Sequence, residues 1–139
     1  MATDAIERRG LQVAFAAAGL VPVSAGLAGG LYGSTAFGQM VAIGLDSHIR
    51  YLSGLLLGIG LIYWSAIPGV EKEGGRIGVL TLIVVIGGFC RALGMLVYGP
   101  AGAPAVAALA MELIVAPGLY LWQRRLAHRA AMDVVAPWR

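Results

Sequence analysis

The sequence predicts an all-α integral membrane protein: a bundle of four transmembrane helices forming a single domain over residues 1–139. Composition is the first reason, because 59% hydrophobic residues, 12% charged residues and a mean hydropathy of +0.82 are not typical of a soluble domain. The second reason is the presence of four apolar runs of about 20 residues, the length that crosses a bilayer. The predicted spans are residues 11–32, 49–67, 77–98 and 103–122.

The first span follows a positive doublet, Arg8 and Arg9, which is also how a cleaved signal peptide begins. Its apolar stretch of about 22 residues is longer than a typical signal core, so we expect a retained helix. The connection to the second span is partly apolar at residues 40–43, and we expect this part to lie on the membrane or dip into it.

The second span ends before Pro68 and Gly69, and the charged residues after them are typical of a loop in water. Only a few residues separate the third span from the fourth, so these two spans form an antiparallel helical hairpin. The tail, residues 123–139, mixes arginines with Leu126, Met132 and Trp138. We expect it to be an amphipathic segment on an anionic membrane surface.

The orientation follows from the positive residues beside the spans, because Lys and Arg are enriched in cytoplasmic loops. One side carries Arg8, Arg9, Lys72, Arg76, Arg124, Arg125, Arg129 and Arg139. The opposite side carries only Arg50. Both termini are therefore predicted to be cytoplasmic, in a multi-pass membrane protein.

Two opposite charges lie inside the predicted hairpin, Arg91 in the third span and Glu112 in the fourth. At the helical rise per residue, Arg91 lies ~10 Å below Tyr98 and Glu112 lies ~14 Å below Ala103. Ionisable side chains at this depth are costly, so they usually pair and are often functional. The pair is open to two interpretations: a buried salt bridge that only fixes helix register, or part of a ligand or catalytic site.

Further polar residues are predicted on the same, non-cytoplasmic side of the membrane. Together they suggest an outward-facing binding pocket built from Asp46, His48, Arg50, Tyr51, Arg91, Tyr98 and Glu112. Glu112 and Asp46 are the candidate catalytic residues if the protein is an enzyme, since a carboxyl group can act as an acid or base.

Several functions are disfavoured by the residues present. Cys90 is the only cysteine, so no intrachain disulfide or CxxC metal motif can form. His48 and His128 are predicted on opposite sides of the membrane and cannot together ligate one haem. We expect no cofactor, no metal and no nucleic-acid partner.

The order of three motifs resembles a known family. The motifs are Asp46-Ser47-His48-Ile49-Arg50-Tyr51, Gly87-Gly88-Phe89-Cys90-Arg91 and Met111-Glu112-Leu113. They resemble a family of small bacterial four-span proteins whose domain has no known function, and more distantly the DoxX and DoxD membrane proteins. The resemblance extends over roughly Gly19 to Trp122. It implies the four-helix membrane fold and points to the charged residues of these motifs, without implying an activity.

Three functions remain open. The first is a non-enzymatic membrane protein, either a subunit of a membrane complex or a binder of a small amphiphile or lipid. The second is an acid/base enzyme of isomerase or cyclase type acting on a lipid or terpenoid, and the third is a small transporter. Membrane lipid is the expected partner in each case, with a protein partner or homo-oligomer as a further possibility.

Overall fold

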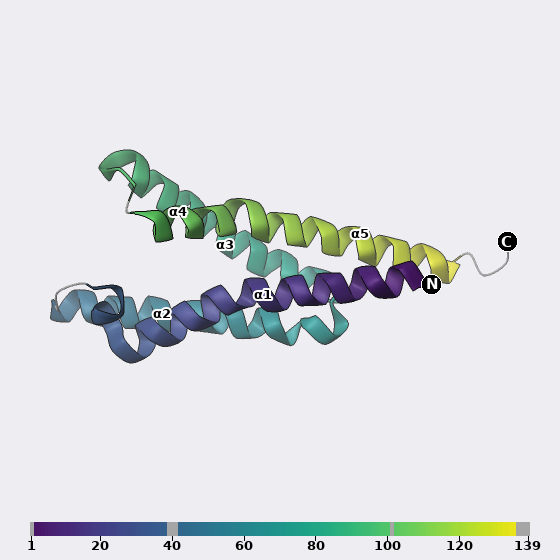
Figure 1. The fold of residues 1–139 in the computed structure, drawn as a ribbon, viewed down its shortest axis with the longest axis horizontal. Coiled ribbons are helices and arrows are strands. Elements are labelled where there is room, and N and C mark those ends of the chain that lie inside the picture. The colour runs from purple at the N-terminus through teal and green to yellow at the C-terminus, as the bar shows by residue number, and fades with distance from the viewer. Residues whose placement is uncertain (1, 39–41, 101, 136–139) are drawn as a thin grey trace. The chain divides into compact units, whose positions relative to one another are not determined.

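The computed structural model describes residues 2–38, 42–100 and 102–135, and this part of the chain is helical with no strand. The elements, in order along the chain, are α1 (Ala2–Tyr32), the 3-10 turn η1 (Gly33–Phe37), α2 (Ile43–Ser65), the 3-10 turn η2 (Ile67–Gly69), α3 (Gly74–Tyr98), α4 (Ala103–Ala110), the π-helical turn η3 (Met111–Val115) and α5 (Ala116–Val135). Figure 1 shows α4 and α5 following one another beside α3.

Four stretches of the described residues are long and apolar enough to cross a membrane. They are Ala5–Phe37, Ile43–Gly69, Gly74–Tyr98 and Ala103–Met132. Each contains one predicted span, so the prediction of four membrane-length helices is confirmed. The predicted contribution of Met40 and Val41 to a membrane-dipping segment, and of Trp138 and Arg139 to the tail, falls outside the described residues.

The second helix begins earlier than predicted, at Ile43 and not at residue 49. Asp46 therefore lies in the first turn of α2 and His48 lies within the helix, where the sequence interpretation had a connecting loop. A carboxylate is favourable in the first helical turn because it interacts with the positive end of the helix dipole. The polar residues before the apolar run thus lie in the first two turns of the helix, although they resemble a loop.

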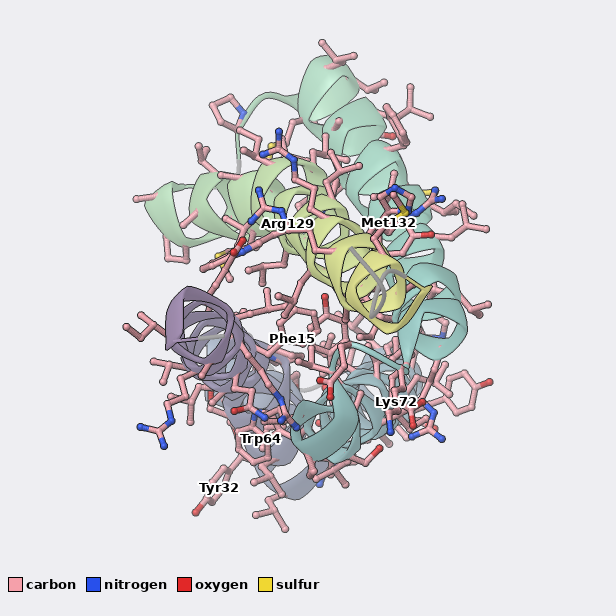
Figure 2. The ribbon with its side chains drawn as sticks, turned by 90° about the vertical axis from the view of Figure 1, so that its right-hand side faces the viewer. Phe15, Tyr32, Trp64, Lys72, Arg129 and Met132 are labelled. Atoms are coloured by element: carbon pink, nitrogen blue, oxygen red, sulfur yellow. The ribbon has the colours of Figure 1, made fainter. Side chains whose placement is uncertain are left out.

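The described residues divide into two compact units, and α1 contributes to both. The first unit is Phe15–Ser65, in which the rest of α1 packs against α2. Phe15 stacks on Tyr63 with ring centroids 4.7 Å apart, and the Trp64 indole donates a hydrogen bond to the Ala16 carbonyl. Tyr32, at the other end of α1, is 65% exposed and points away from these helices (Figure 2).

A glycine sets the spacing of α1 and α2. A Cβ built on Gly26 would lie 2.6 Å from the backbone nitrogen of Leu57, closer than real atoms approach. The two backbones are therefore in direct contact at this point. Close approach through small residues is the usual way that helices associate in membranes, where van der Waals packing replaces the hydrophobic effect.

The second unit combines the start of α1, up to Ala14, with the described residues from Ala66 onward. Here α3 packs along η3 and α5, with Ile77, Leu80, Leu119 and Leu126 buried. The single-domain organisation stays a prediction.

The turn after α2 is held by side chains from both ends of this second unit. Gln12 donates to the Ile67 carbonyl, Arg8 donates to the Pro68 carbonyl, and Gln123 donates to the Val70 carbonyl, each at 2.9 Å. We call this arrangement the turn clasp. It supplies side-chain donors to three backbone carbonyls in η2 and directly after it.

Candidate functional site

Arg91 and Glu112 form a two-point ion pair between α3 and η3. The Arg91 Nε donates to Glu112 Oε2 at 2.9 Å, and its Nη2 donates to Glu112 Oε1 at 2.8 Å. This parallel geometry is the strongest form of arginine–carboxylate contact, because two charge-assisted hydrogen bonds also fix the relative orientation of the groups. The structure thus brings together the two charges whose matching depth predicted contact.

Glu112 belongs to a π-helical turn, which the sequence interpretation did not foresee. In η3 the Ala116 amide donates to the Met111 carbonyl, five residues back along the chain. Pro117 follows directly and has no amide hydrogen, so a regular α-helix would leave the Leu113 carbonyl unpaired and in contact with the proline ring. A π-turn accommodates such a residue, and these turns occur frequently at functional sites.

Gly88 allows η3 to lie close to α3. Its hypothetical Cβ would be 2.7 Å from Leu113 Cδ2 and 3.0 Å from Glu112 Cβ. A larger residue would have to displace the side chain beside the carboxylate. Gly88 is therefore part of what positions Glu112 opposite Arg91.

Part of Arg91 remains available beyond this pair. A guanidinium has five N–H donors, and Glu112 accepts from two of them. Among the described residues, no other hydrogen-bond partner of Arg91 is present. Its side chain is 41% exposed, against 20% for Glu112. The pair is therefore closed on the carboxylate side and open on the arginine side.

Asp46 and Arg50 form a second pair, within α2. The Arg50 Nε donates to Asp46 Oδ2 at 2.8 Å, across one helical turn. The other oxygen, Oδ1, accepts from the Ser34 amide at 2.8 Å and from the Ser34 hydroxyl at 3.1 Å. Both oxygens of Asp46 are thus occupied, one within its own helix and one by the turn after α1.

Arg50 also binds the end of α1. Its Nη1 donates to the carbonyls of Gly30 and Leu31, both at 2.9 Å, which are among the last acceptors of α1 and have no helical donor. Gly33 adopts a φ of 61°, and a Cβ there would collide with the Asp46 carboxylate. We call these five residues (Gly30, Leu31, Ser34, Asp46 and Arg50) the α1–α2 joint. It connects the end of α1 to the start of α2, and its role is structural.

The remaining predicted pocket residues are separate from these hydrogen bonds. His48, Tyr51 and Tyr98 are exposed, Tyr51 to 64% and Tyr98 to 90%, and none donates to or accepts from either ion pair. The two ion pairs belong to different units of the chain. The pocket of seven residues stays a prediction.

Sequence reasoning named all four members of the two pairs but missed Ser34 and Gly33, which surround the Asp46 carboxylate. The spacing of four between Asp46 and Arg50 on one helix is a signal that could have identified their contact. Ser34 and Gly33 carry no such signal, because their roles depend on how a turn packs against another helix. In the described part of the chain, His, Cys, Asp and Glu do not gather in a group of three or more that could hold a metal ion.

Comparison with known proteins supports the resemblance to an uncharacterised four-helix family. No curated protein and no solved structure matches the chain. A family model does match, over residues 10–123, and its description is "Domain of unknown function (DUF4345)". This confirms the resemblance to an uncharacterised small four-helix family, whereas the distant likeness to DoxX and DoxD stays a prediction. The matched segment includes both ion pairs and all four membrane-length helices in large part, and the chain therefore belongs to the DUF4345 family.

Proposed function

We propose that this is a non-enzymatic integral membrane protein that binds the polar head of a small amphiphile at the Arg91–Glu112 pair. The observation that carries the proposal is the open side of Arg91, whose side chain is 41% exposed within a membrane-length helix. Donors that lack a partner inside a membrane are costly, and a ligand that accepts from them gains the corresponding free energy.

Free space beside Arg91 supports this role. Gly87 and Gly94 lie four residues before and three residues after Arg91, on the same face of α3. No heavy atom lies within 4 Å of the position that a Cβ would occupy at either glycine. A head group bearing phosphate, carboxylate or carbonyl oxygens has room there to accept from the guanidinium, while Glu112 holds the arginine in place.

The acid/base enzyme is not favoured by the same geometry. Both oxygens of Glu112 accept hydrogen bonds from Arg91, so a substrate could reach this carboxylate only at the lone pairs that the guanidinium leaves. Both oxygens of Asp46 are occupied in the α1–α2 joint. The enzyme, the transporter and the complex subunit remain alternatives, and no contact in the described residues favours them over amphiphile binding.

The proposal places the protein in a bacterial inner membrane with both termini cytoplasmic. The distribution of Lys and Arg beside the spans supports this orientation, and the resemblance to small bacterial four-span proteins supports the location. A reporter fused to the C-terminus should then give a cytoplasmic signal. An external signal would show that the protein has the opposite orientation.

Native mass spectrometry of the protein purified in mild detergent tests the binding. The parent should retain a defined small amphiphile, and Arg91→Gln should lose it. Arg91→Lys keeps a positive charge but not the planar fork, so it should retain the molecule at about a tenth of the occupancy. Arg9→Gln, which removes an exposed arginine from α1, is the matched control and should retain it fully.

Folding is measured separately, by far-UV circular dichroism and size-exclusion chromatography of each variant. Retention of the same amphiphile by folded Arg91→Gln would contradict the proposal. A protein chain that copurifies with the parent and is lost in this variant would instead support the complex-subunit alternative.

A further inference from the structure

A shallow groove lies on α5, outside both ion pairs. It is lined by Gly118, Leu121, Trp122, Arg124, Arg125 and His128. These residues recur at spacings of three and four along one helix, so they form a continuous stripe. All the lining residues belong to a single helix, which means that the groove has one protein wall and is open on its other side.

The order of the lining residues follows the depth of a membrane. Gly118 and Leu121 lie within the predicted apolar span, Trp122 lies at its end, and the basic residues come directly after it. Tryptophan is enriched at the boundary between hydrocarbon and head groups, and arginine is enriched just beyond it. The groove therefore changes from apolar to basic in the same order as a phospholipid changes from acyl chain to phosphate.

Charge compensation is uneven around this groove. Glu7 of α1 accepts from the Trp122 indole at 3.2 Å and from Arg129 at 2.8 Å, so it fixes the tryptophan and neutralises Arg129. Figure 2 looks onto this end of α5, where Arg129 and Met132 are labelled. Arg124 and Arg125 make no ion pair with any acid in the described residues. Their two positive charges face the groove uncompensated.

We infer that this groove is a binding site for an anionic phospholipid, with the phosphate at Arg124, Arg125 and His128 and an acyl chain along Leu121 and Gly118. Charge complementarity selects an anionic over a zwitterionic head group. The open side of the groove selects a ligand already in the bilayer, because the neighbouring lipid completes the wall that the protein lacks. This site is independent of the Arg91–Glu112 pair and goes beyond the proposed function.

Lipid retention in nanodiscs of mixed phosphatidylglycerol and phosphatidylcholine, measured by native mass spectrometry, tests the inference. The parent should retain phosphatidylglycerol preferentially. Arg124→Gln combined with Arg125→Gln should lower the apparent affinity about 10- to 30-fold, because each arginine near the surface contributes attraction to anionic lipid. Arg9→Gln combined with Lys72→Gln removes the same charge from exposed residues of the predicted cytoplasmic side and should keep the preference.

A second variant tests the shape of the site without changing its charge. Gly118→Leu should fill the groove and reduce retention, and it should fold normally because no heavy atom lies within 4 Å of a Cβ there. Arg91→Gln should leave phosphatidylglycerol in place, which separates this site from the proposed amphiphile site.

Three results would overturn the inference. One is equal retention of both lipids by the parent, and another is an equal loss in the two double variants, which would indicate general surface charge. The third is displacement of the lipid by excess inorganic phosphate, which would identify a plain anion site.

Discussion

The two arginine–carboxylate pairs have similar hydrogen-bond lengths and different surroundings. In the α1–α2 joint, Asp46 and Arg50 also bind the backbone of Gly30, Leu31 and Ser34. In the hairpin, Arg91 and Glu112 bind only one another among the described residues. The first pair also forms hydrogen bonds with backbone groups at the helix ends. The second pair connects α3 to η3 through side-chain hydrogen bonds alone.

This difference shows how a charged residue with a structural role can be distinguished from one that is available to bind a ligand. Pair distance does not discriminate, because the shortest contact is 2.8 Å in both cases. The partners of the two arginines do: Arg50 donates to a carboxylate and to two backbone carbonyls, whereas Arg91 donates to Glu112 alone and has unused donors beside open space. Variants that remove one or both members of each pair put this comparison to a direct test.

The largest expected effect is on the free energy of unfolding of Glu112→Gln. This change leaves Arg91 charged and unpaired in a membrane-length helix, so we expect a loss of about 3 kcal/mol, by analogy with buried pairs in soluble proteins. Adding Arg91→Gln should restore most of that loss, since no charge then remains. Denaturant titration in detergent micelles measures both variants, and parental stability in Glu112→Gln would contradict the expectation.

The same double removal in the α1–α2 joint should not restore stability. Asp46→Asn and Arg50→Gln each lower the melting temperature, and their combination should lower it further. The reason is that the Gly30 and Leu31 carbonyls lose their charged donor and the Ser34 amide loses its charged acceptor. The effect should be smaller than that of Glu112→Gln, because the joint lies at the ends of α1 and α2, whereas Arg91 and Glu112 lie well inside two membrane-length stretches, where an unpaired charge costs more. Recovery of the melting temperature in the double variant would contradict this expectation and indicate that Asp46 and Arg50 stabilise the protein only through each other.

A smaller effect is expected at the close approach of α3 and η3. Gly88→Ala inserts a methyl group against Leu113 and Glu112, and we expect a cost of about 1 kcal/mol from overpacking. Gly87→Ala is the matched control on the neighbouring position, where a Cβ meets no atom within 4 Å. It should be neutral or slightly stabilising, since alanine is the better helix former. Thermal melts of the two variants side by side measure the difference.

The smallest change in stability is expected for Pro117→Ala, although this substitution should alter the geometry of the Arg91–Glu112 pair. The new amide can donate to the Leu113 carbonyl, so η3 should relax toward an α-helix and turn Glu112 away from its present position. The coupling energy between Arg91 and Glu112, obtained from a double-mutant cycle, should therefore fall. Pro22→Ala, which alters a proline in α1, should leave it unchanged.

The membrane-length helices could be predicted because span length depends on a local property, the number of consecutive apolar residues. Contact between Arg91 and Glu112 could be predicted because the short connection fixes two helices as neighbours. The start of α2 was misplaced because Asp46 is equally compatible with a loop and with a first helical turn. The π-turn could not be predicted from Pro117 alone, since a proline inside a helix more often produces a bend.

The turn clasp has a consequence for how this protein is made. Chains are synthesised from the N-terminus, and the clasp joins the Val70 carbonyl to Gln123, a side chain 53 positions later. Arg8 and Gln12 can engage the turn as soon as α2 is complete, but the last contact waits until the ribosome has delivered α5. In a nascent chain that stops before Gln123, only Arg8 and Gln12 can therefore bind this turn. The turn clasp is complete only when α5, the last helix to be synthesised, is in place.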